Sequence, residues 1–512
     1  MTDYVAEAPE LMEFFGRPPS ALLESAPRSA PWDASLVTAL AEYQEAIGGR
    51  ALFMGDEAVV MTGQQTGLLT GPLYTIYKAA TAIRLAKKVH SRFGVACVPV
   101  FWAASDDHDF EEARTAHLLT KRHEVTPLRY DPAAAVEALP MYRVPLDPSL
   151  HGLVDHAASQ APGSEFRDEV AAFLHESLDA SGSLADWTAR ILARLFRDTP
   201  LIVFVPHLPA ARALAAPVIE QEIAQPLEST MLLNEAGKRL KEAGYHQQVA
   251  KGATACNFFI EMGGRRRKVL FEDERYVIPD EHVSCSTDEL LRMLASAPER
   301  FSGNVALRCI VQQHLFPVAA YVAGPGEVAY WAQLRQVFAH FDTAMPAVYP
   351  RARCVLTTRK LDQLREKFGF ALEDLAGPAD DLAERALERT SRAPARDVLA
   401  RHRETIGTAL RPLPEELEPF NKTAARMARK AAQRWAQELD RVERTILKGD
   451  EAQAAAVGKQ VARLCNALYP SRKPQERVCN IFSFLFEHGW GLVPRLIEEI
   501  SVDSCDLKEI EL

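Results

Sequence analysis

The chain has 512 residues, and its 59 lysines and arginines against 69 aspartates and glutamates give a formal net charge of −10. A hydrophobic fraction of 47% and a charged fraction of 25% are ordinary for globular proteins. These values exclude a disordered chain, a collagen-like repeat and a small disulfide scaffold, and the acidic balance argues against a nucleic-acid-binding protein.

The N-terminus and the cysteines predict where the protein works. The first residues show no basic region followed by an apolar run, so no secretory signal is expected. The longest apolar runs, such as 201–205, are much shorter than the ~20 residues of a membrane span. The eight cysteines contain no C-x-x-C pair, which favours reduced, buried thiols. We therefore expect a cytoplasmic protein without a membrane partner.

The first elements predict a strand–loop–helix–strand unit. An apolar run at 58–61 has the size of a buried strand, and a glycine-rich loop follows at 62–71. Helical spacing then runs from Pro72 to a stop at Gly94, before a second strand at 96–102. This order indicates a βαβ unit with a right-handed crossover. Pro99 is unexpected in it, because proline prefers strand edges.

The middle of the chain predicts the rest of an α/β core. We expect further strands at 201–205, 305–311 and 319–323. Between them, 113–200 and 206–304 are interpreted as insertions on one doubly wound sheet, so that the core spans 1–355. Within the insertions the spacing predicts helices at 166–178, 186–196 and 230–244, and strand-like runs at 257–260 and 268–271.

The C-terminal third changes character. Residues 356–469 are rich in Ala, Leu, Arg and Glu, and apolar residues recur every three or four positions from Phe420 to Ile446. This spacing predicts a long amphipathic helix, broken at 449–450, with a partner stripe at 399–410. It forms either a helical hairpin with its own core or a coiled-coil arm that pairs two subunits. Residues 470–512 regain aromatic side chains and are expected to return to the core.

The loop at 62–71 is the first candidate site. It follows the carboxyl end of a strand, where doubly wound sheets bind ligands. Its glycines allow close backbone approach, and the helix start offers free N–H groups to a phosphate or carboxylate. The alternative is a tight connection with structural glycines. The candidate substrate-binding residues here are Gln64, Gln65, Thr70, Gly71 and Lys78.

The acidic segment 105–112 follows the second strand and faces the same edge. We expect Asp107, His108 and Asp109 to be catalytic, as general base or as ligands of hydroxyl groups. The neighbouring carboxylates are expected to raise the pKa of His108. Alternatively, Asp106 or Asp109 caps a short helix. Because no second His-rich element accompanies the segment, no metal site is predicted.

A third glycine-rich turn begins at Gly324 and precedes a helix predicted at 328–340. It repeats the arrangement of strand, turn and helix N-terminus. The run 265–268, with three arginines and a lysine, is interpreted as a solvated turn. The candidate substrate-binding residues of this region are Gly326, Glu327, Tyr330 and Arg351, the last as an anion clamp.

Three signature segments together resemble the BshC family, the cysteine ligases of bacillithiol biosynthesis. They are T-G-Q-Q-x-G-L-L-T-G-P-L-Y-T-I-Y-K at 62–78, V-F-W-A-A-S-D-D-H-D-F-E-E at 100–112 and G-P-G-E-V-A-Y-W at 324–331, and the closing segment with P-Q-E-R at 474–477 agrees with them. The resemblance spans nearly the whole chain. It implies an α/β fold with a Rossmann-like, nucleotidyltransferase-type doubly wound core, connecting-peptide insertions and a C-terminal α-helical coiled-coil domain that forms a homodimer.

The resemblance also implies an activity. Members add cysteine to the amino group of glucosaminyl malate, an amide-forming carbon–nitrogen ligation on two small-molecule substrates. The H-x-G-H and K-M-S-K-S strings of related nucleotidyltransferases do not occur here, so the activating co-substrate stays open between ATP and another nucleotide. Two alternatives remain open: a dimeric ligand-binding or scaffold protein of the same pathway, and a nucleotidyl or sugar transferase with another acceptor.

Overall fold

The computed structural model describes residues 1–390 and 395–512. Its contacts divide the chain into two compact units. The core unit consists of Met1–Lys121, Val125–Val355 and Glu476–Ile510, and the helical unit of Arg122–Glu124, Leu356–Gln475 and Glu511–Leu512. Among the described residues, no helix has both the length and the apolar character needed to cross a membrane.

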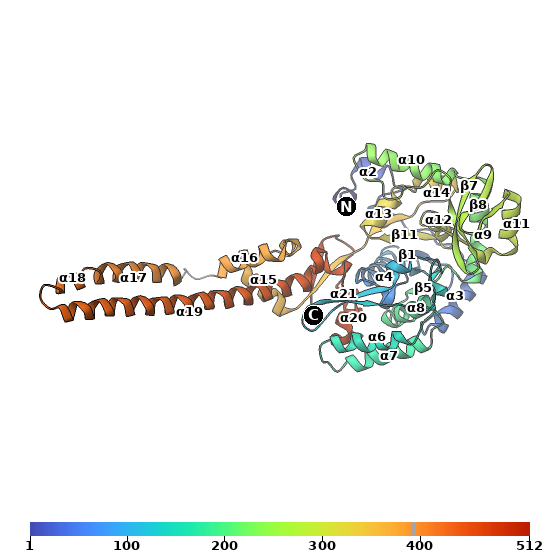
Figure 1. Cartoon of the computed structure of the whole chain (residues 1–512). Coiled ribbons are helices and arrows are strands. Elements are labelled where there is room, and N and C mark those ends of the chain that lie inside the picture. Colours follow the sequence, from blue (N-terminus) through green and yellow to red (C-terminus); the bar gives the residue numbers. More distant parts are fainter. Residues whose placement is uncertain (391–394) are drawn as a thin grey trace. The chain divides into compact units, whose positions relative to one another are not determined.

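The core unit is built on a five-stranded sheet whose neighbouring strands are all parallel (Figure 1). Side chains of the central strand alternate between its faces, with Val59 and Met61 in one apolar cluster and Val60 in the other. This arrangement confirms the predicted α/β core. In spatial order the strands are β12 (Ala347–Pro350), β11 (Val318–Ala323), β1 (Ala58–Gln65), β2 (Cys97–Ala104) and β5 (Ile202–Phe204).

Strand β1 runs further than its apolar residues predict. Residues 62–65 pair with β2 rather than forming a loop. The pairing requires glycine at position 63, since a Cβ there would lie 2.8 Å from the carbonyl oxygen of Trp102. Pro99 aligns with Val60 of β1 inside β2. It is tolerated there because the pairing of β2 with β5 begins only at Val100, so Pro99 has a paired strand on one side alone.

Helices cover both faces of the parallel sheet. Helix α4 is buried along most of its length and ends, as predicted, at Gly94 in the left-handed conformation with φ 70°. The helices of the core unit are α1 (Thr2–Val5), α2 (Pro9–Met12), α3 (Ala34–Ala46), α4 (Tyr74–Phe93), α5 (Phe110–Ala113), α6 (Ser149–Gln160), α7 (Arg167–Asp179), α8 (Leu184–Leu195), α9 (Pro209–Ala224), α10 (Glu228–Glu242), α11 (Thr287–Ser296), α12 (Leu307–Leu315), α13 (Pro325–Trp331), α14 (Arg335–His340), α20 (Phe482–His488) and α21 (Leu492–Glu499).

The second insertion builds a separate antiparallel sheet instead of adding layers to the first. Short two-stranded sheets also occur, one joining β3 (Thr115–Leu119) to β4 (Val125–Arg129) and one joining β13 (Arg353–Thr357) to β14 (Leu507–Glu511). The order in the larger antiparallel sheet is β10 (Phe301–Gly303), β6 (Ala255–Met262), β7 (Arg265–Glu272), β8 (Arg275–Ile278) and β9 (Val283–Cys285).

Two predicted elements of the core unit are wrong. The run at 305–311 belongs to helix α12, because the Asn304 side chain accepts hydrogen bonds from the backbone N–H groups of Ala306 and Leu307 and so caps a helix start. The predicted helix at 328–340 is two helices, α13 and α14, separated by a turn at 332–334.

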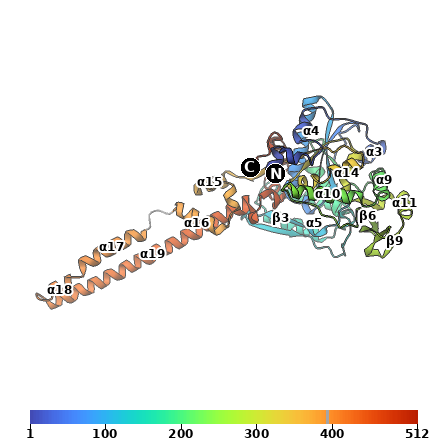
Figure 2. The same cartoon turned by 90° about the horizontal axis from the view of Figure 1, so that it is seen from above.

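The helical unit is dominated by α19, which runs without interruption from Lys422 to Leu468. The predicted break at 449–450 is wrong, since a single glycine lowers helix stability but does not end a long helix. Helix α17 lies alongside α19 in Figures 1 and 2, and Arg403 of α17 pairs with Asp440 at 2.8 Å and Glu443 at 3.0 Å. The remaining helices are α15 (Arg359–Phe368), α16 (Ala379–Thr390), α17 (Ala395–Leu410) and α18 (Leu413–Leu417).

Candidate functional site

A cavity of about 680 Å³ opens in the core unit at the carboxyl ends of β1, β2 and β11. Its wall combines these strand ends with residues of the antiparallel sheet and of α12. The three signature segments, which are far apart in the sequence, therefore meet at one place. Of the candidate residues, the cavity is lined by Gln64, Gln65, Lys78, Asp107, His108, Gly326, Glu327, Tyr330 and Arg351.

Thr70 and Gly71 do not reach this cavity. Residues 68–70 form a buried turn, and the Asn480 side chain donates hydrogen bonds to the carbonyl oxygens of Leu69 at 2.8 Å and Gly71 at 2.6 Å. The backbone N–H of Leu73, at the helix start, bonds to the Cys479 carbonyl oxygen at 2.8 Å. The N–H group at this helix start, which the sequence offered to an anion, is therefore already hydrogen-bonded within the protein.

Asp109 does not line the cavity either. Its side chain accepts a hydrogen bond from the backbone N–H of Glu112 at 3.1 Å and caps α5. Of the two interpretations of this aspartate, the structure therefore shows the helix cap.

Lys78 lies in the cavity wall, but its charge is already compensated. Its ammonium pairs with Glu327 at 2.6 Å and bonds to the Gly63 carbonyl and to Oε1 of Gln64 at 3.1 Å. Glu327 also accepts hydrogen bonds from the Tyr321 hydroxyl at 2.7 Å and from a backbone N–H. Burial lowers the pKa of Lys78, and Glu327 opposes that shift. The Lys78–Glu327 pair therefore adds no net charge to this part of the cavity wall.

His108 has a different electrostatic environment from the predicted one. Burial and the Arg266 guanidinium lower its pKa, and together they outweigh Asp107 and Asp109. Arg266 approaches Nδ1 of His108 at 3.4 Å and Asp107 at 3.6 Å. Because a guanidinium only donates, Nδ1 is the acceptor and the proton of the neutral ring lies on Nε2. The predicted rise in pKa is wrong, and the ring presents an N–H donor.

Arg266 was expected in a solvated turn, and it is a buried part of the site. It lies at the start of β7, where its Nε donates to Ser302 at 3.0 Å and its Nη2 to the Gly303 carbonyl at 2.8 Å. Its guanidinium also lies 3.9 Å from the centre of the Phe259 ring. Arg266 is the buried residue of the basic run, and the strand-like run that follows at 268–271 was the signal that could have placed it on a strand.

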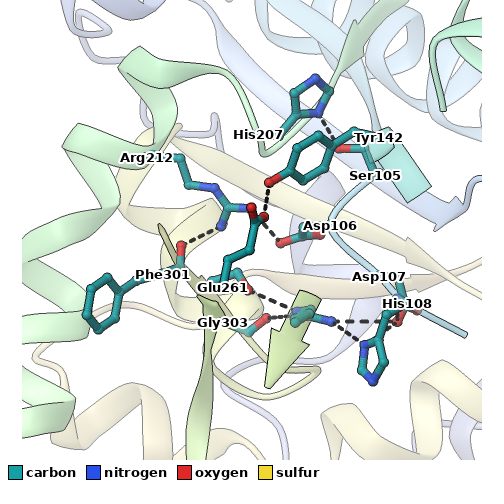
Figure 3. A network of polar contacts seen from close by, with 12 residues as sticks. Ser105, Asp106, Asp107, His108, Tyr142, His207, Arg212, Glu261, Phe301 and Gly303 are labelled. Carbon is teal, nitrogen blue, oxygen red and sulfur yellow. Dashed lines mark hydrogen bonds and ion pairs between the residues drawn. The ribbon is translucent and has the colours of Figure 1, made fainter. Parts of the chain in front are cut away.

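A second set of polar contacts holds the first two residues of the acidic segment, Ser105 and Asp106. Asp106 lies 3.5 Å from Arg212, which donates to the Phe301 carbonyl at 2.7 Å. Ser105 and Nδ1 of His207 are 2.7 Å apart, and Tyr142 stacks on His207 at 4.6 Å (Figure 3). Burial, with Arg212 nearby, lowers the pKa of His207 to about 4.

This low pKa predicts a pH-dependent stability. Between pH 6.5 and about 4 the unfolded chain takes up a proton at His207 that the folded chain refuses, so the free energy of unfolding falls as pH falls through this window. At about 1.4 kcal/mol per pH unit, the loss from this group is about 3 kcal/mol. In urea unfolding at pH 7.5 and 4.5, His207→Gln should reduce the pH dependence, whereas the exposed control His156→Gln should keep it. Equal pH dependence in all three proteins would contradict the assignment.

Glu112 is a site residue that the sequence did not single out. Its side chain lines the cavity and is exposed to solvent. Partial burial, with the Asp109 and Asp107 carboxylates nearby, raises its pKa. A carboxylate whose pKa is shifted toward neutrality is suited to accept a proton from an ammonium group.

Among residues 1–390 and 395–512, no three His, Cys, Asp or Glu side chains are grouped as metal ligands.

Comparison with known proteins agrees with the two-part architecture. Residues 1–352 match the family model "Bacillithiol biosynthesis BshC, N-terminal Rossmann-like domain", and residues 354–509 match "Bacillithiol biosynthesis BshC, C-terminal coiled-coil domain". Three similar proteins carry the name "Putative cysteine ligase BshC". That of Salinibacter ruber is 31% identical over 449 residues, covering 88% of this chain and 82% of its own.

The other two proteins extend the similarity across distant bacteria. That of Symbiobacterium thermophilum is 31% identical over 494 residues, with 92% of this chain and 88% of its own covered. That of Prosthecochloris aestuarii is 33% identical over 474 residues, with 87% and 81% covered. With both domain models matched and similarity over most of each protein, the chain belongs to the BshC family of bacillithiol biosynthesis.

Proposed function

We propose that this protein joins the carboxyl group of cysteine to the amino group of glucosaminyl malate, forming an amide. Its relatives are named cysteine ligases, and the family belongs to bacillithiol biosynthesis. One observation carries the proposal: the side chains of three separate signature segments line a single cavity that holds both carboxylates and cations. Such a cavity suits a small acceptor that bears both an ammonium group and carboxylates.

The proposed chemistry assigns roles to the residues of the cavity. The amine attacks the carboxyl carbon of activated cysteine, so that a C–N bond forms, a C–O bond breaks and the amine loses its protons. Glu112 and Asp107 are placed to accept them, since both carboxylates line the cavity. His108, with its proton on Nε2, donates to a substrate oxygen.

A carboxylate must be activated before an amine displaces oxygen from it, and ATP or another nucleotide is the proposed activator. Related nucleotidyltransferase folds place a nucleotide at the first strand-to-helix turn. Here Leu68 and Leu69 are fully buried in that turn, and the backbone N–H groups of residues 70, 71 and 73 already donate to carbonyl oxygens of the chain, so the residues present do not fit a phosphate there. No step is therefore assigned to a nucleotide at that turn.

The test is an assay with the purified full chain, glucosaminyl malate and cysteine, with and without ATP, read by mass spectrometry. The amide product is expected. AMP with pyrophosphate would indicate an adenylate, and ADP with phosphate an acyl phosphate. If no product forms and a strain without the gene does not accumulate glucosaminyl malate, the ligase proposal is overturned. Accumulation without activity in vitro would favour the scaffold alternative.

We also propose that the protein forms a homodimer through α19. Met427, Trp435 and Val442 remain 68%, 51% and 46% exposed, and their spacing is close to the heptad repeat of paired helices. Trp435→Glu is expected to shift the sedimentation coefficient from dimer to monomer, because it places a charge in an apolar seam. The control Gln437→Glu, at another exposed position of α19, should remain dimeric. A monomeric wild type would contradict the pairing.

A further inference from the structure

Arg308 is a cation of the cavity whose charge the protein leaves uncompensated. It lies on α12 and borders the cavity, between the rings of Trp102 and Tyr321, whose centres are 6.0 Å and 5.7 Å from its guanidinium carbon. Its Nη2 donates to the Tyr330 hydroxyl at 2.8 Å. Within the described part of the chain, Arg308 forms no ion pair with a carboxylate.

The other cations of the cavity wall differ in their pairing: within the described residues Lys251 and Arg477, like Arg308, form no ion pair, whereas three others are paired with carboxylates. Lys78 pairs with Glu327 at 2.6 Å, and Arg351 makes a bidentate pair with Glu476. Arg266 lies 3.6 Å from Asp107. A partly buried guanidinium without a counter-charge is unfavourable, and aromatic faces offset this only in part. The charge at Arg308 is therefore suited to an anion supplied by a ligand.

The position of this charge in the cavity indicates how a substrate is oriented. Glu112 has the Asp107 and Asp109 carboxylates nearby, whereas Arg308 lies beside the neutral side chains of Tyr321 and Tyr330, and the charge of Glu327 is neutralised by Lys78. The cavity thus has an acidic part and a cationic part. A molecule that carries an ammonium group and a carboxylate satisfies both parts when its ammonium lies near Glu112 and its carboxylate near Arg308.

We propose that Arg308 binds a carboxylate of the acceptor substrate and so directs the acceptor's amino group toward Glu112 and Asp107. This inference rests on the proposed function, since it takes the malate part of glucosaminyl malate as the source of the carboxylate. A guanidinium binds a carboxylate through two parallel hydrogen bonds, which fixes orientation as well as affinity. Tyr330 then acts as a positioning residue that holds Nη2 of Arg308.

The test compares binding by the full chain and its Arg308→Gln and Arg308→Lys variants in isothermal titration calorimetry. The probes are glucosaminyl malate, glucosamine and ATP. Arg308→Gln is expected to weaken glucosaminyl malate binding about 10- to 100-fold, to leave glucosamine binding unchanged and to leave ATP binding unchanged. Arg308→Lys should fall between, because it keeps the charge without the planar fork. The control Arg292→Gln, at an exposed position of α11, should bind as wild type.

Three results would overturn the inference. The first is wild-type affinity for glucosaminyl malate in a folded Arg308→Gln variant. The second is loss of ATP binding alone, which would assign the arginine to a phosphate. The third needs no variant: a wild-type protein that binds glucosamine as tightly as glucosaminyl malate has no carboxylate subsite. Failure of the proposed function is distinguishable, because it would appear as Arg308-dependent binding without amide product.

Discussion

Replacing Glu112 by glutamine is expected to lower the turnover number for amide formation by about 10²- to 10⁴-fold, the usual effect of losing a general base. Glutamine keeps the shape and hydrogen-bonding capacity of the side chain but does not take up a proton at neutral pH. The Michaelis constant for the acceptor should change much less. The matched control is Glu111→Gln: Glu111 is an exposed neighbour, paired with Arg114 at 2.6 Å, and does not line the cavity.

The pH profile gives an independent check. The raised pKa of Glu112 means that the carboxylate is protonated, and inactive as a base, at a higher pH than an ordinary glutamate. In the wild type, kcat/KM should therefore fall on acidification already above the ordinary glutamate range, and Glu112→Gln should lack this limb. A variant that keeps both the turnover number and the acidic limb would remove Glu112 from the mechanism and leave Asp107 as the base.

Replacing Glu476 by glutamine is expected to lower the free energy of unfolding by about 3–5 kcal/mol. The Glu476 carboxylate and the Arg351 guanidinium are 4% and 5% exposed and make two parallel hydrogen bonds of 2.6 Å and 2.8 Å. The substitution leaves a buried guanidinium without its counter-charge. Urea unfolding followed by tryptophan fluorescence measures the loss.

A double variant serves as the control, because it removes both charges of the Arg351–Glu476 pair instead of leaving one of them buried without its partner. In the double variant Arg351→Met with Glu476→Met, both charges are gone and apolar groups of similar volume remain, so most of the stability should return. A single variant as stable as wild type, or a double variant less stable than the single one, would contradict a net role for charge pairing. The same pair explains why P-Q-E-R, at the far end of the sequence, belongs with the site: Glu476 holds Arg351, and Arg477 lines the cavity.

The convergence of the three signature segments followed from a local rule. Each was predicted at the carboxyl end of a strand, and the carboxyl ends of neighbouring parallel strands meet at one edge of a sheet. The structure places β11, β1 and β2 side by side, and the candidate residues at their ends line one cavity. Three candidates, Thr70, Gly71 and Asp109, do not line the cavity. The turn that holds the first two is hydrogen-bonded by Asn480, and Asp109 is used as the cap of α5. Sequence position alone does not predict these hydrogen bonds.

The basic side chains of the site depend on contacts between distant parts of the chain. Arg266 reaches the acidic segment because β7 pairs within the antiparallel sheet, and Arg308 lines the cavity because the run that contains it forms helix α12 instead of a strand. The pKa of His108 likewise depends on a residue that is distant in the sequence. Its neighbours in sequence are carboxylates, which predict a rise, whereas burial and Arg266 lower it.

The sequence by itself indicated the family, through the resemblance of its signature segments. It also determined the parallel α/β core, the helical C-terminal third and the strand ends that carry the site, because these follow from residue spacing along the chain. Only the tertiary structure decided which charged groups pair with one another, which ring nitrogen of His108 carries the proton and which cations are left for a ligand. These properties depend on burial and on distances of a few ångströms between residues far apart in sequence, and electrostatic energies change steeply over such distances.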